Sequence, residues 1–395
     1  MSFQGYLRPN NTVGIRNYVL VIPGGLVGTK ICEFVRGART LVTADFGSGR
    51  TKRDRETIAR VLVGLGRNPN VAGVIVHGVS IGSGYPELRP EVLAEQIAQT
   101  GKPVEVISSK KYPDVLQVIE RGIRVARQMV REASNIRREN FDDGYLSIGV
   151  KCGRSDSTSG IAGNPVMGYL FDKVVGSGGT AFFGETTEII GAEHLLAKRA
   201  ANQEVAREII RVTMETEERA KNCGEDIRTI NPVPSNIAGG ISTLEEKSLG
   251  AIEKAGNAQI QGVLKYAEAP RGKGLYFVDN WMSQLSIFLG YAAAGATLTF
   301  YQVGGGGLLE DTLLSPSPTA ITPILWTTAN HNTLRAAGES IDFYSGGVIE
   351  GKETIEESGE KLLELVKQVA SGSVTKTETI RYQDPAQVYL LDPPF

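Results

Sequence analysis

The sequence predicts an α/β fold built from two doubly wound, mainly parallel-sheet domains, and three observations carry this prediction. Short apolar segments alternate with longer amphipathic ones along most of the chain, which is the pattern of strands followed by helices. Turns rich in glycine separate the segments, and the chain contains 47 glycines. Its 395 residues are enough for two domains. Strands alternating with helices are typical of a parallel sheet covered on both faces.

Residues 1–142 are predicted to form a flavodoxin-like or Rossmann-like domain. Its expected strands are Tyr18–Ile22, Thr40–Ala44, Val71–His77 and Val104–Ser108. Its expected helices are Val27–Val35, Arg53–Leu65, Pro90–Thr100 and Val115–Ala133. The polar run 132–144 lacks apolar periodicity, so we place the domain boundary there; the solvated end of the preceding helix is the alternative.

Residues 143–395 are predicted to form a second α/β domain that carries the site. It begins with a strand at Tyr145–Val150, which breaks into a polar loop. Asn164 is expected to cap the next helix, Val166–Val175, and a strand follows at Thr180–Gly184. A right-handed crossover of this kind makes both strands end at the same edge of the sheet. The loops that follow them should therefore lie side by side, where ligands usually bind.

The remaining elements predict that this second sheet is also parallel. The expected helices are one long charged helix that starts at Glu193, passes Thr216 and ends near Asn222, followed by Thr243–Ala255, Leu285–Gly295 and Thr354–Ala370. The expected strands are Leu275–Val278, Thr297–Val303 and Ile341–Tyr344. The segment NPVPSNIAGG is expected to be a loop because it combines two prolines with a terminal glycine pair.

Composition excludes several classes of function. The formal charge of -2 and a pI near 6.1 give no electrostatic footprint for nucleic acid. No apolar run approaches the roughly 20 residues that cross a bilayer, and the N-terminus lacks the apolar core of a signal peptide. Cys32, Cys152 and Cys223 are too few and odd in number for a disulfide framework. We therefore expect a cytoplasmic protein with reduced thiols and no membrane association.

The two neighbouring loops carry side chains that suit a divalent metal. They supply Cys152, Asp156, Glu185, Glu188 and His194, and the chain has only three histidines. Removing a proton next to a carboxylate builds up negative charge, which a chelated divalent cation stabilises. These residue types therefore point to metal-assisted elimination from a 2-hydroxy acid.

A structural interpretation of the same residues competes with this one. Cys152 is then a small core residue, Glu188 and Glu193 cap a helix, and His194 is an ordinary interior or surface group. Residue types alone do not decide between the two interpretations.

Polar side chains that follow the predicted strands are candidates for substrate binding. They are Ser155, Ser157 and Thr158 in the first loop and Asn236, Asp279 and Asn330 further along the chain. Ordinary turn chemistry is the alternative for each of them. The glycines 304–307 offer a cradle for an anion but lack the Lys-Ser/Thr ending of a nucleotide P-loop. Gly24-Gly25 and GVSIGSG at 78–84 lack the dinucleotide fingerprint, and His77 is expected to be a packed or capping residue.

Long motifs resemble the altronate and galactarate dehydratase family. They are KCGRSDSTSGIAGNPVMG, GETTEIIGAEH, GYLRPNNTVGIRNYVLVIP, RNPNVAGVIVHG, NPVPSNIAGGISTLEEKSLGAIEKAG and the PSPTAITPILWTTAN region, and together they span nearly the whole chain. The resemblance implies lyases that dehydrate sugar acids to 2-keto-3-deoxy acids with iron or another divalent metal. The family also includes the large subunit of sulfolactate sulfo-lyase, from whose substrate sulfite leaves, and the first two motifs resemble that subunit most.

Two departures from the family pattern bear on the metal. Where the family's dehydratases often carry Gly-Cys-Ser and Gly-Cys-Glu, this chain has Gly24-Gly25-Leu26 and Gly78-Val79-Ser80. The sequence also begins at GYLRP, without the small histidine-containing module of single-chain members. By resemblance to two-subunit members, we expect that module as a separate partner chain.

We therefore expect a metal-dependent hydro-lyase acting on a sugar acid. The expected cofactor is Fe²⁺, with Mn²⁺ or Mg²⁺ as alternatives, bound by Cys152, Glu185, Glu188 and His194. His194, Glu185 and Asp156 are the expected catalytic residues, and a residue of the partner module is the alternative general base. A sulfo-lyase large subunit and a non-catalytic sugar-acid-binding subunit are the competing functions, and we also expect a homo-oligomer.

Overall fold

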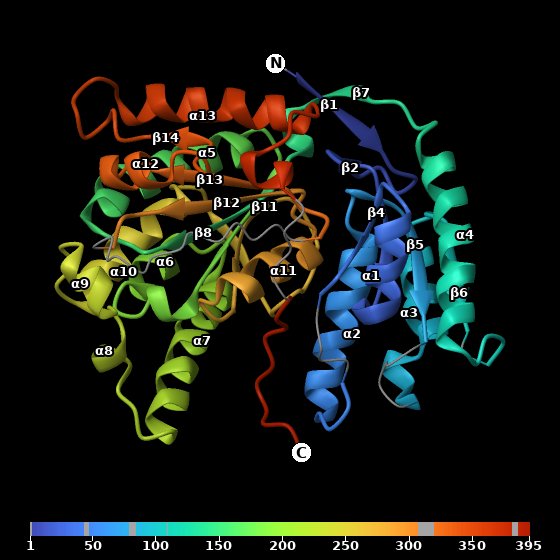
Figure 1. Ribbon diagram of the computed structural model, residues 1–395. Coiled ribbons are helices and arrows are strands. Elements are labelled where there is room, and N and C mark those ends of the chain that lie inside the picture. Colours follow the sequence, from blue (N-terminus) through green and yellow to red (C-terminus); the bar gives the residue numbers. More distant parts are fainter. Residues whose placement is uncertain (1, 43–46, 79–83, 109, 307–319, 381–385) are drawn as a thin grey trace.

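The chain forms two parallel β-sheets that stand side by side, each with helices on both faces (Figure 1). The computed structural model describes residues 2–42, 47–78, 84–108, 110–306, 320–380 and 386–395. All strand pairs within both sheets are parallel. The predicted α/β class is confirmed. Among the described helices, none combines the length and the apolar character that crossing a bilayer requires.

The first sheet is doubly wound, as predicted. Its strands lie in the order β4 (Ala38–Thr40), β3 (Tyr18–Ile22), β5 (Val71–His77) and β6 (Val104–Ile107). Helices α1 (Gly25–Phe34) and α4 (Val115–Ala133) pack on one face, and α2 (Lys52–Arg67) and α3 (Pro90–Ala98) pack on the other. The predicted helices and the other three strands are confirmed to within a few residues. The predicted strand Thr40–Ala44 was misplaced, because β4 ends at Thr40 and residues 41–42 are not in a strand; residues 43–44 fall outside the described residues.

The second sheet places β8 (Ser147–Gly153) at its centre. The full order is β10 (Ile260–Leu264), β11 (Gly274–Val278), β9 (Thr180–Gly184), β8, β12 (Leu298–Val303), β13 (Ile324–Thr328) and β14 (Phe343–Tyr344). After β8 the chain moves to the β9 side, whereas after β12 it moves to the opposite side. The loops that leave β8 and β12 therefore diverge, and this topological switch point is the usual ligand crevice of an open parallel sheet.

Helix α11 (Gln284–Ala294) joins the two halves and is buried on all sides. Its Ile287 and Tyr291 pack on the second sheet, while its Leu289 and Ala293 pack in the same cluster as α2 of the first half. An apolar surface around the whole helix is what such a double contact requires. The opposite face of the second sheet is covered by α5 (Asn164–Gly176), α7 (Gln203–Asn222) and α13 (Ile355–Ala370).

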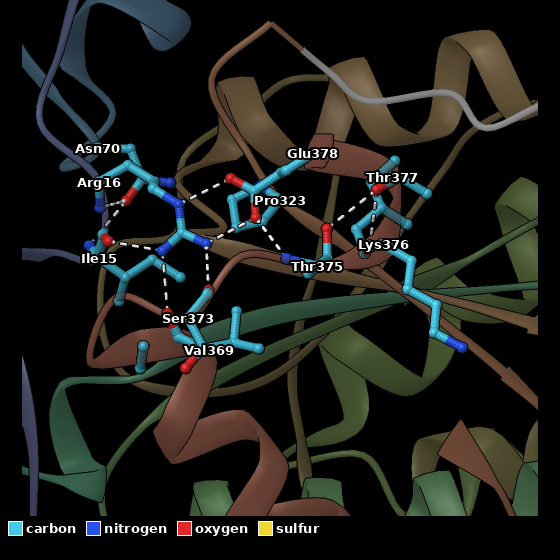
Figure 2. A network of polar contacts seen from close by, with 12 residues as sticks. Ile15, Arg16, Asn70, Pro323, Val369, Ser373, Thr375, Lys376, Thr377 and Glu378 are labelled. Atoms are coloured by element: carbon cyan, nitrogen blue, oxygen red, sulfur yellow. Dashed lines mark hydrogen bonds and ion pairs between the residues drawn. The ribbon is translucent and has the colours of Figure 1, made fainter. Parts of the chain in front are cut away.

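Figure 2 shows a polar clasp that ties the chain's beginning to its C-terminal part. Arg16 donates two hydrogen bonds to the carboxylate of Glu378, at 2.8 and 2.6 Å. Its remaining N–H groups donate to the carbonyls of Ile15, Val369 and Ser373, each at 2.9 Å. The guanidinium thus has five buried or half-buried acceptors, so the ion pair is fixed in one geometry.

A small antiparallel sheet was not predicted. It consists of β2 (Val13–Gly14), β1 (Ser2–Leu7) and β7 (Glu139–Asp142). Strand β7 lies inside the polar run where we placed the domain boundary, and its side chains are mostly exposed. Backbone pairing with a segment more than 130 residues away holds it, and such pairing leaves no apolar period in the sequence.

Several local predictions in the second half were wrong. The expected long helix from Glu193 to near Asn222 is two helices, α6 (Glu193–Ala197) and α7, because the backbone between them pairs with Ile260; its predicted end is confirmed. Asn164 does not cap α5: a π-helical turn precedes it, and its side chain donates to the carbonyl of Gly250 at 2.7 Å. The expected loop NPVPSNIAGG contains the short helix α9 (Pro234–Ala238). Strands β10 and β13 were not predicted.

Candidate functional site

Two loops meet at the carboxyl edge of the second sheet, as the crossover argument predicts. Strands β8 and β9 pair in parallel, Cys152 lies near the end of β8, and Glu185 directly follows β9. A 3₁₀ turn then brings in Glu188. The Cys152 Sγ atom lies 2.8 Å from Glu188 Oε2 and 3.5 Å from Glu185 Oε2, and all three side chains are buried.

Glu185 is held in an unusual backbone conformation. Its φ of 72° lies in the left-handed region, which non-glycine residues rarely adopt. Its N–H donates to Asn280 Oδ1 at 2.8 Å, and its carboxylate accepts the Cys152 N–H at 3.1 Å. Strained residues of this kind cluster at functional sites. Both ends of the residue are therefore fixed, and the carboxylate points at the end of β8.

Three buried lysines surround these acidic groups. The Lys254 Nζ atom lies 2.5 Å from Glu185 Oε2, 2.9 Å from Cys152 Sγ and 3.6 Å from Glu188 Oε2. The Lys151 Nζ atom lies 3.1 Å from Glu185 Oε1 and donates to the Cys152 carbonyl at 2.6 Å. Each carboxylate therefore faces at least two ammonium groups.

The third lysine connects the buried group to the loop after β8. Lys247 lies on α10 (Leu244–Ile252), and its Nζ atom is 3.2 Å from Glu188 Oε1. It also donates to Asn236 Oδ1 at 3.0 Å. The amide of Asn236 in turn donates to the carbonyl of Ser155 at 2.9 Å. A continuous chain of polar contacts therefore runs from Glu188 to the loop that carries Asp156.

Burial and the neighbouring charges shift the pKa values of Glu188 and Cys152 in opposite directions. Burial raises the pKa of Glu188, but the ammonium groups of Lys247, Lys254 and Lys151 outweigh it and bring the pKa to about 2. Burial, together with the charges of Glu185 and Glu188, raises the pKa of the Cys152 thiol. Two carboxylates, three ammonium groups and a neutral thiol leave the group with one excess positive charge.

The same group is the only one among the described residues with the spacing of a metal site. One ligand atom from each of Cys152, Glu185 and Glu188 lies within 4.8 Å of the others, and thiolate and carboxylate are suitable donors. However, the Lys254 ammonium lies within 3.6 Å of all three donors, where a bound cation would sit. As arranged, the donor set does not fit a metal ion, because two cations would have to share one position.

His194 does not belong to this group. It lies on α6, its side chain is exposed, and no atom of it joins the ligand atoms of Cys152, Glu185 and Glu188. The expectation that it is a fourth ligand is therefore corrected. The short helix turns its histidine outward while Leu196 packs into the core, as the structural interpretation of His194 predicts.

A polar cavity of about 550 Å³ opens at the switch point. Its lining comes from the loops after β8, β12 and β13, from α9 and from α12 (His331–Ala337). The lining residues are Asp156, Ser157, Thr158, Ala238, Gly239, Gly305, Asn330, Asn332, Arg335 and Ala336. These residues offer hydroxyl and amide groups, one carboxylate and one guanidinium to the cavity, and the remainder are small residues.

Asp156 organises the cavity wall. Its Oδ2 atom accepts the Gly305 N–H at 2.5 Å and the Asn330 amide at 2.7 Å. Its Oδ1 atom accepts the Thr158 hydroxyl at 2.6 Å and the Ser159 N–H at 3.1 Å. One carboxylate thus ties together the loops after β8, β12 and β13. A Cβ atom at position 305 would lie 2.4 Å from the Asn330 amide nitrogen, so this close approach requires glycine.

The predicted substrate-binding residues separate into two sets. Ser157, Thr158 and Asn330 line the cavity. Ser155 and Asn236 are buried beneath it in the chain of contacts from Lys247. Asp279 lies apart, accepting the Thr186 hydroxyl at 2.7 Å, and burial raises its pKa.

The structure describes only part of the glycine motifs of the sequence. Gly304, Gly305 and Gly306 adjoin Asp156 and Arg154, whereas residue 307 falls outside the described residues, as does most of segment 78–84. His77 is buried with Nε2 3.2 Å from the carbonyl oxygen of Gly24, and burial lowers its pKa to about 4. The expectation of a packed histidine is confirmed.

Sequence reasoning missed the three lysines and Arg335. A signal existed for two of them: Lys247 and Lys254 are seven residues apart, and both fall on the stripe of α10 and its 3₁₀ extension that also carries Leu244 and Ala251. Lysines on an apolar stripe indicate buried ion pairs. Nothing in the pattern around Arg335 distinguishes it from other exposed arginines.

Two sequence models of one protein family together match most of the chain. The sequence model of the D-galactarate/altronate dehydratase C-terminal domain matches residues 144–390, and that of the second domain of D-galactarate dehydratase/altronate hydrolase matches residues 5–134. The chain belongs to this dehydratase family. Both loops of the candidate site fall within the C-terminal match. The family's named members are lyases, and the resemblance of the motifs is thereby confirmed.

Three relatives illustrate the range of the family. The chain is 35% identical to the (2R)-sulfolactate sulfo-lyase subunit beta of Chromohalobacter salexigens, over 97% of this chain and 96% of that protein. It is 29% identical to the altronate dehydratase of Bacillus subtilis, over 98% of this chain and 77% of that protein. It is 30% identical to the galactarate dehydratase (L-threo-forming) of Escherichia coli, over 79% of this chain and 59% of that protein.

Proposed function

We propose that this member of the dehydratase family is a lyase that removes water from a sugar acid and yields a 2-keto-3-deoxy acid. The observation that carries the proposal is the polar cavity at the switch point, whose wall offers a guanidinium, hydroxyls and amides. Small polyhydroxy acids present a carboxylate and several hydroxyls, and this set of groups complements them.

The residues on the cavity wall have distinct proposed roles. Arg335 pairs with the substrate's carboxylate, because a guanidinium binds a carboxylate through two parallel hydrogen bonds. Ser157, Thr158 and Asn330 bind the hydroxyls. Asp156 positions the three loops through its hydrogen bonds to Gly305 and Asn330.

The proposed reaction takes a proton from the carbon next to the carboxylate. The C–O bond at the following carbon breaks, water leaves, and the resulting enol takes up a solvent proton to become the 2-keto acid. The excess positive charge of the buried lysine group stabilises the negative charge that develops. His194 is exposed and is not among the residues that line the cavity, so a residue of a partner chain is the proposed proton acceptor ahead of it. The proposed catalytic roles of Glu185 and Asp156 are electrostatic and positioning, respectively.

The resemblance also implies a divalent metal. Fe²⁺ is the proposed metal, and Mn²⁺ and Mg²⁺ are the alternatives; activation by each ion is to be tested. Since Lys254 occupies the cation position of the Cys152 group, we assign no step to an ion there.

A second candidate function is the release of sulfite from sulfolactate. The observation that favours it is the 35% identity to a sulfo-lyase subunit over nearly the full length of both chains. The chemistry is the same elimination, with a sulfonate in place of a hydroxyl at the carbon that loses its substituent, and pyruvate is the keto product. That relative is named as a subunit, and this supports our further proposal of a partner chain. A homo-oligomeric assembly and a cytoplasmic location are separate proposals that do not rest on this name.

One assay separates these functions. The chain is incubated with altronate, galactarate and sulfolactate, with and without the small partner and each metal, and 2-keto acid and sulfite are measured. Keto acid without sulfite supports the dehydratase, and pyruvate with equimolar sulfite supports the sulfo-lyase. Substrate binding by calorimetry without any product identifies a non-catalytic sugar-acid-binding subunit and contradicts the proposal.

A further inference from the structure

The acidic group at the end of β8 already contains a cation of its own. Glu185, Glu188 and Cys152 offer three donor atoms to one point, and the Lys254 ammonium occupies that point at 2.5 to 3.6 Å from all three. Lys254 is 1% exposed, so water does not screen these contacts. The other two lysines approach the outer oxygens: Lys151 pairs with Glu185 Oε1, and Lys247 pairs with Glu188 Oε1.

We propose that the Lys254 ammonium, rather than a divalent metal, is the resident cation of the Cys152, Glu185 and Glu188 group. A metal ion needs these same three atoms as ligands at about 2.0 to 2.3 Å. It cannot bind while an ammonium group lies 2.9 Å or less from two of them, because the two positive charges repel at close range. The donors attract a cation, and the chain supplies it.

The charge balance points the same way. Three ammonium groups and two carboxylates already leave one excess positive charge in a fully buried space. A divalent ion would raise this excess to three, or to two with a thiolate, in surroundings of low dielectric constant. Replacing Lys254 by a neutral residue removes both obstacles, since it empties the position and leaves two carboxylates facing two lysines.

This inference does not depend on the lyase activity. The proposed function fails if no substrate is converted, whereas this inference fails on metal binding alone. The two failures are therefore distinguishable.

The test is a titration with Co²⁺ as the only ligand. Binding is measured through the near-ultraviolet absorption band that arises when cobalt binds a thiolate. We compare wild type, Lys254→Gln, Lys254→Met and Lys254→Arg, each with and without Cys152→Ser. Lys254→Arg is the matched control, because it replaces the ammonium group by another cationic group and therefore keeps a positive charge at this position. Circular dichroism confirms that each variant is folded.

We expect wild type and Lys254→Arg to show no cobalt-thiolate band. We expect Lys254→Gln or Lys254→Met to bind Co²⁺ at least about tenfold more tightly than wild type, with a band that Cys152→Ser abolishes. Stoichiometric Co²⁺ uptake by wild type with a Cys152-dependent band overturns the inference, and this arm needs no folded variant. Equal affinity of the neutral variants and wild type also overturns it.

Discussion

Replacing Glu188 by glutamine should remove a large part of the stability of the second half. Each pKa unit corresponds to about 1.4 kcal/mol. The drop in the pKa of Glu188 from 4.5 to about 2 therefore corresponds to about 3 kcal/mol of the free energy of unfolding at pH 7. Loss of one partner from a buried ion pair typically costs about 3–5 kcal/mol, which agrees.

The pH dependence follows from the direction of the shift. The folded protein binds the Glu188 proton less tightly than the unfolded chain, so the stabilisation is complete above pH 4.5 and is lost as the pH falls towards 2. Urea unfolding of wild type and Glu188→Gln across this range should show a difference of about 3 kcal/mol at pH 7 that shrinks below pH 4.5.

The control is Glu120→Gln on α4, which removes an exposed pair with Arg124 and should change stability by less than about 0.5 kcal/mol. A Glu188→Gln difference below about 1 kcal/mol at pH 7, or one that is constant with pH, would refute the account of this group.

The other predictions concern the clasp and the cavity. Arg16→Met should lower the free energy of unfolding by about 3–5 kcal/mol, measured with urea, and Arg16→Lys should recover only part of it because lysine cannot make the two parallel bonds to Glu378. Asp156→Asn places an amide N–H₂ against existing donors, so kcat should fall by about 100-fold in steady-state assays at a temperature where circular dichroism shows the variant is folded; an unchanged kcat contradicts the positioning role. Arg335→Met should raise KM for the acid by about tenfold or more, whereas Arg228→Met, an exposed arginine outside the cavity, should leave KM unchanged.

The sequence predicts most strands of the second sheet, including the edge strand β14, but misses β10 and β13. Strands β8, β9, β11 and β12 are buried runs with strong apolar patterns, so their positions and their common carboxyl edge were predicted. Strand β10 was missed because it is a short edge strand with mixed burial and a glycine at its centre. Strand β7 was missed because its side chains are mostly exposed and its partner β1 lies more than 130 residues away in the sequence. The domain boundary at 142/143 stays a prediction, and the two family matches end and begin at residues 134 and 144.

The sequence predicted only part of the candidate site. The proximity of Cys152, Glu185 and Glu188 could be predicted, because it depends only on the order of the strands that these residues end or follow. It did not predict that Lys254 would fill the space between them, because that lysine comes from a segment about 70 residues further along the chain. His194 follows the same strand as Glu185, but a helix of five residues turns it outward, and sequence spacing carries no information on that rotation.

The most direct test of the central claim, elimination from a 2-hydroxy acid in the cavity beside Asp156, is the reaction in D₂O followed by proton NMR. The enol intermediate must take up one solvent deuteron at the carbon that lost its substituent. We predict a 2-keto acid with one deuterium at that carbon, formed by wild type and strongly reduced in Asp156→Asn. The absence of a 2-keto acid from every substrate, partner and metal combination would contradict the claim, as would a keto product without deuterium at that carbon.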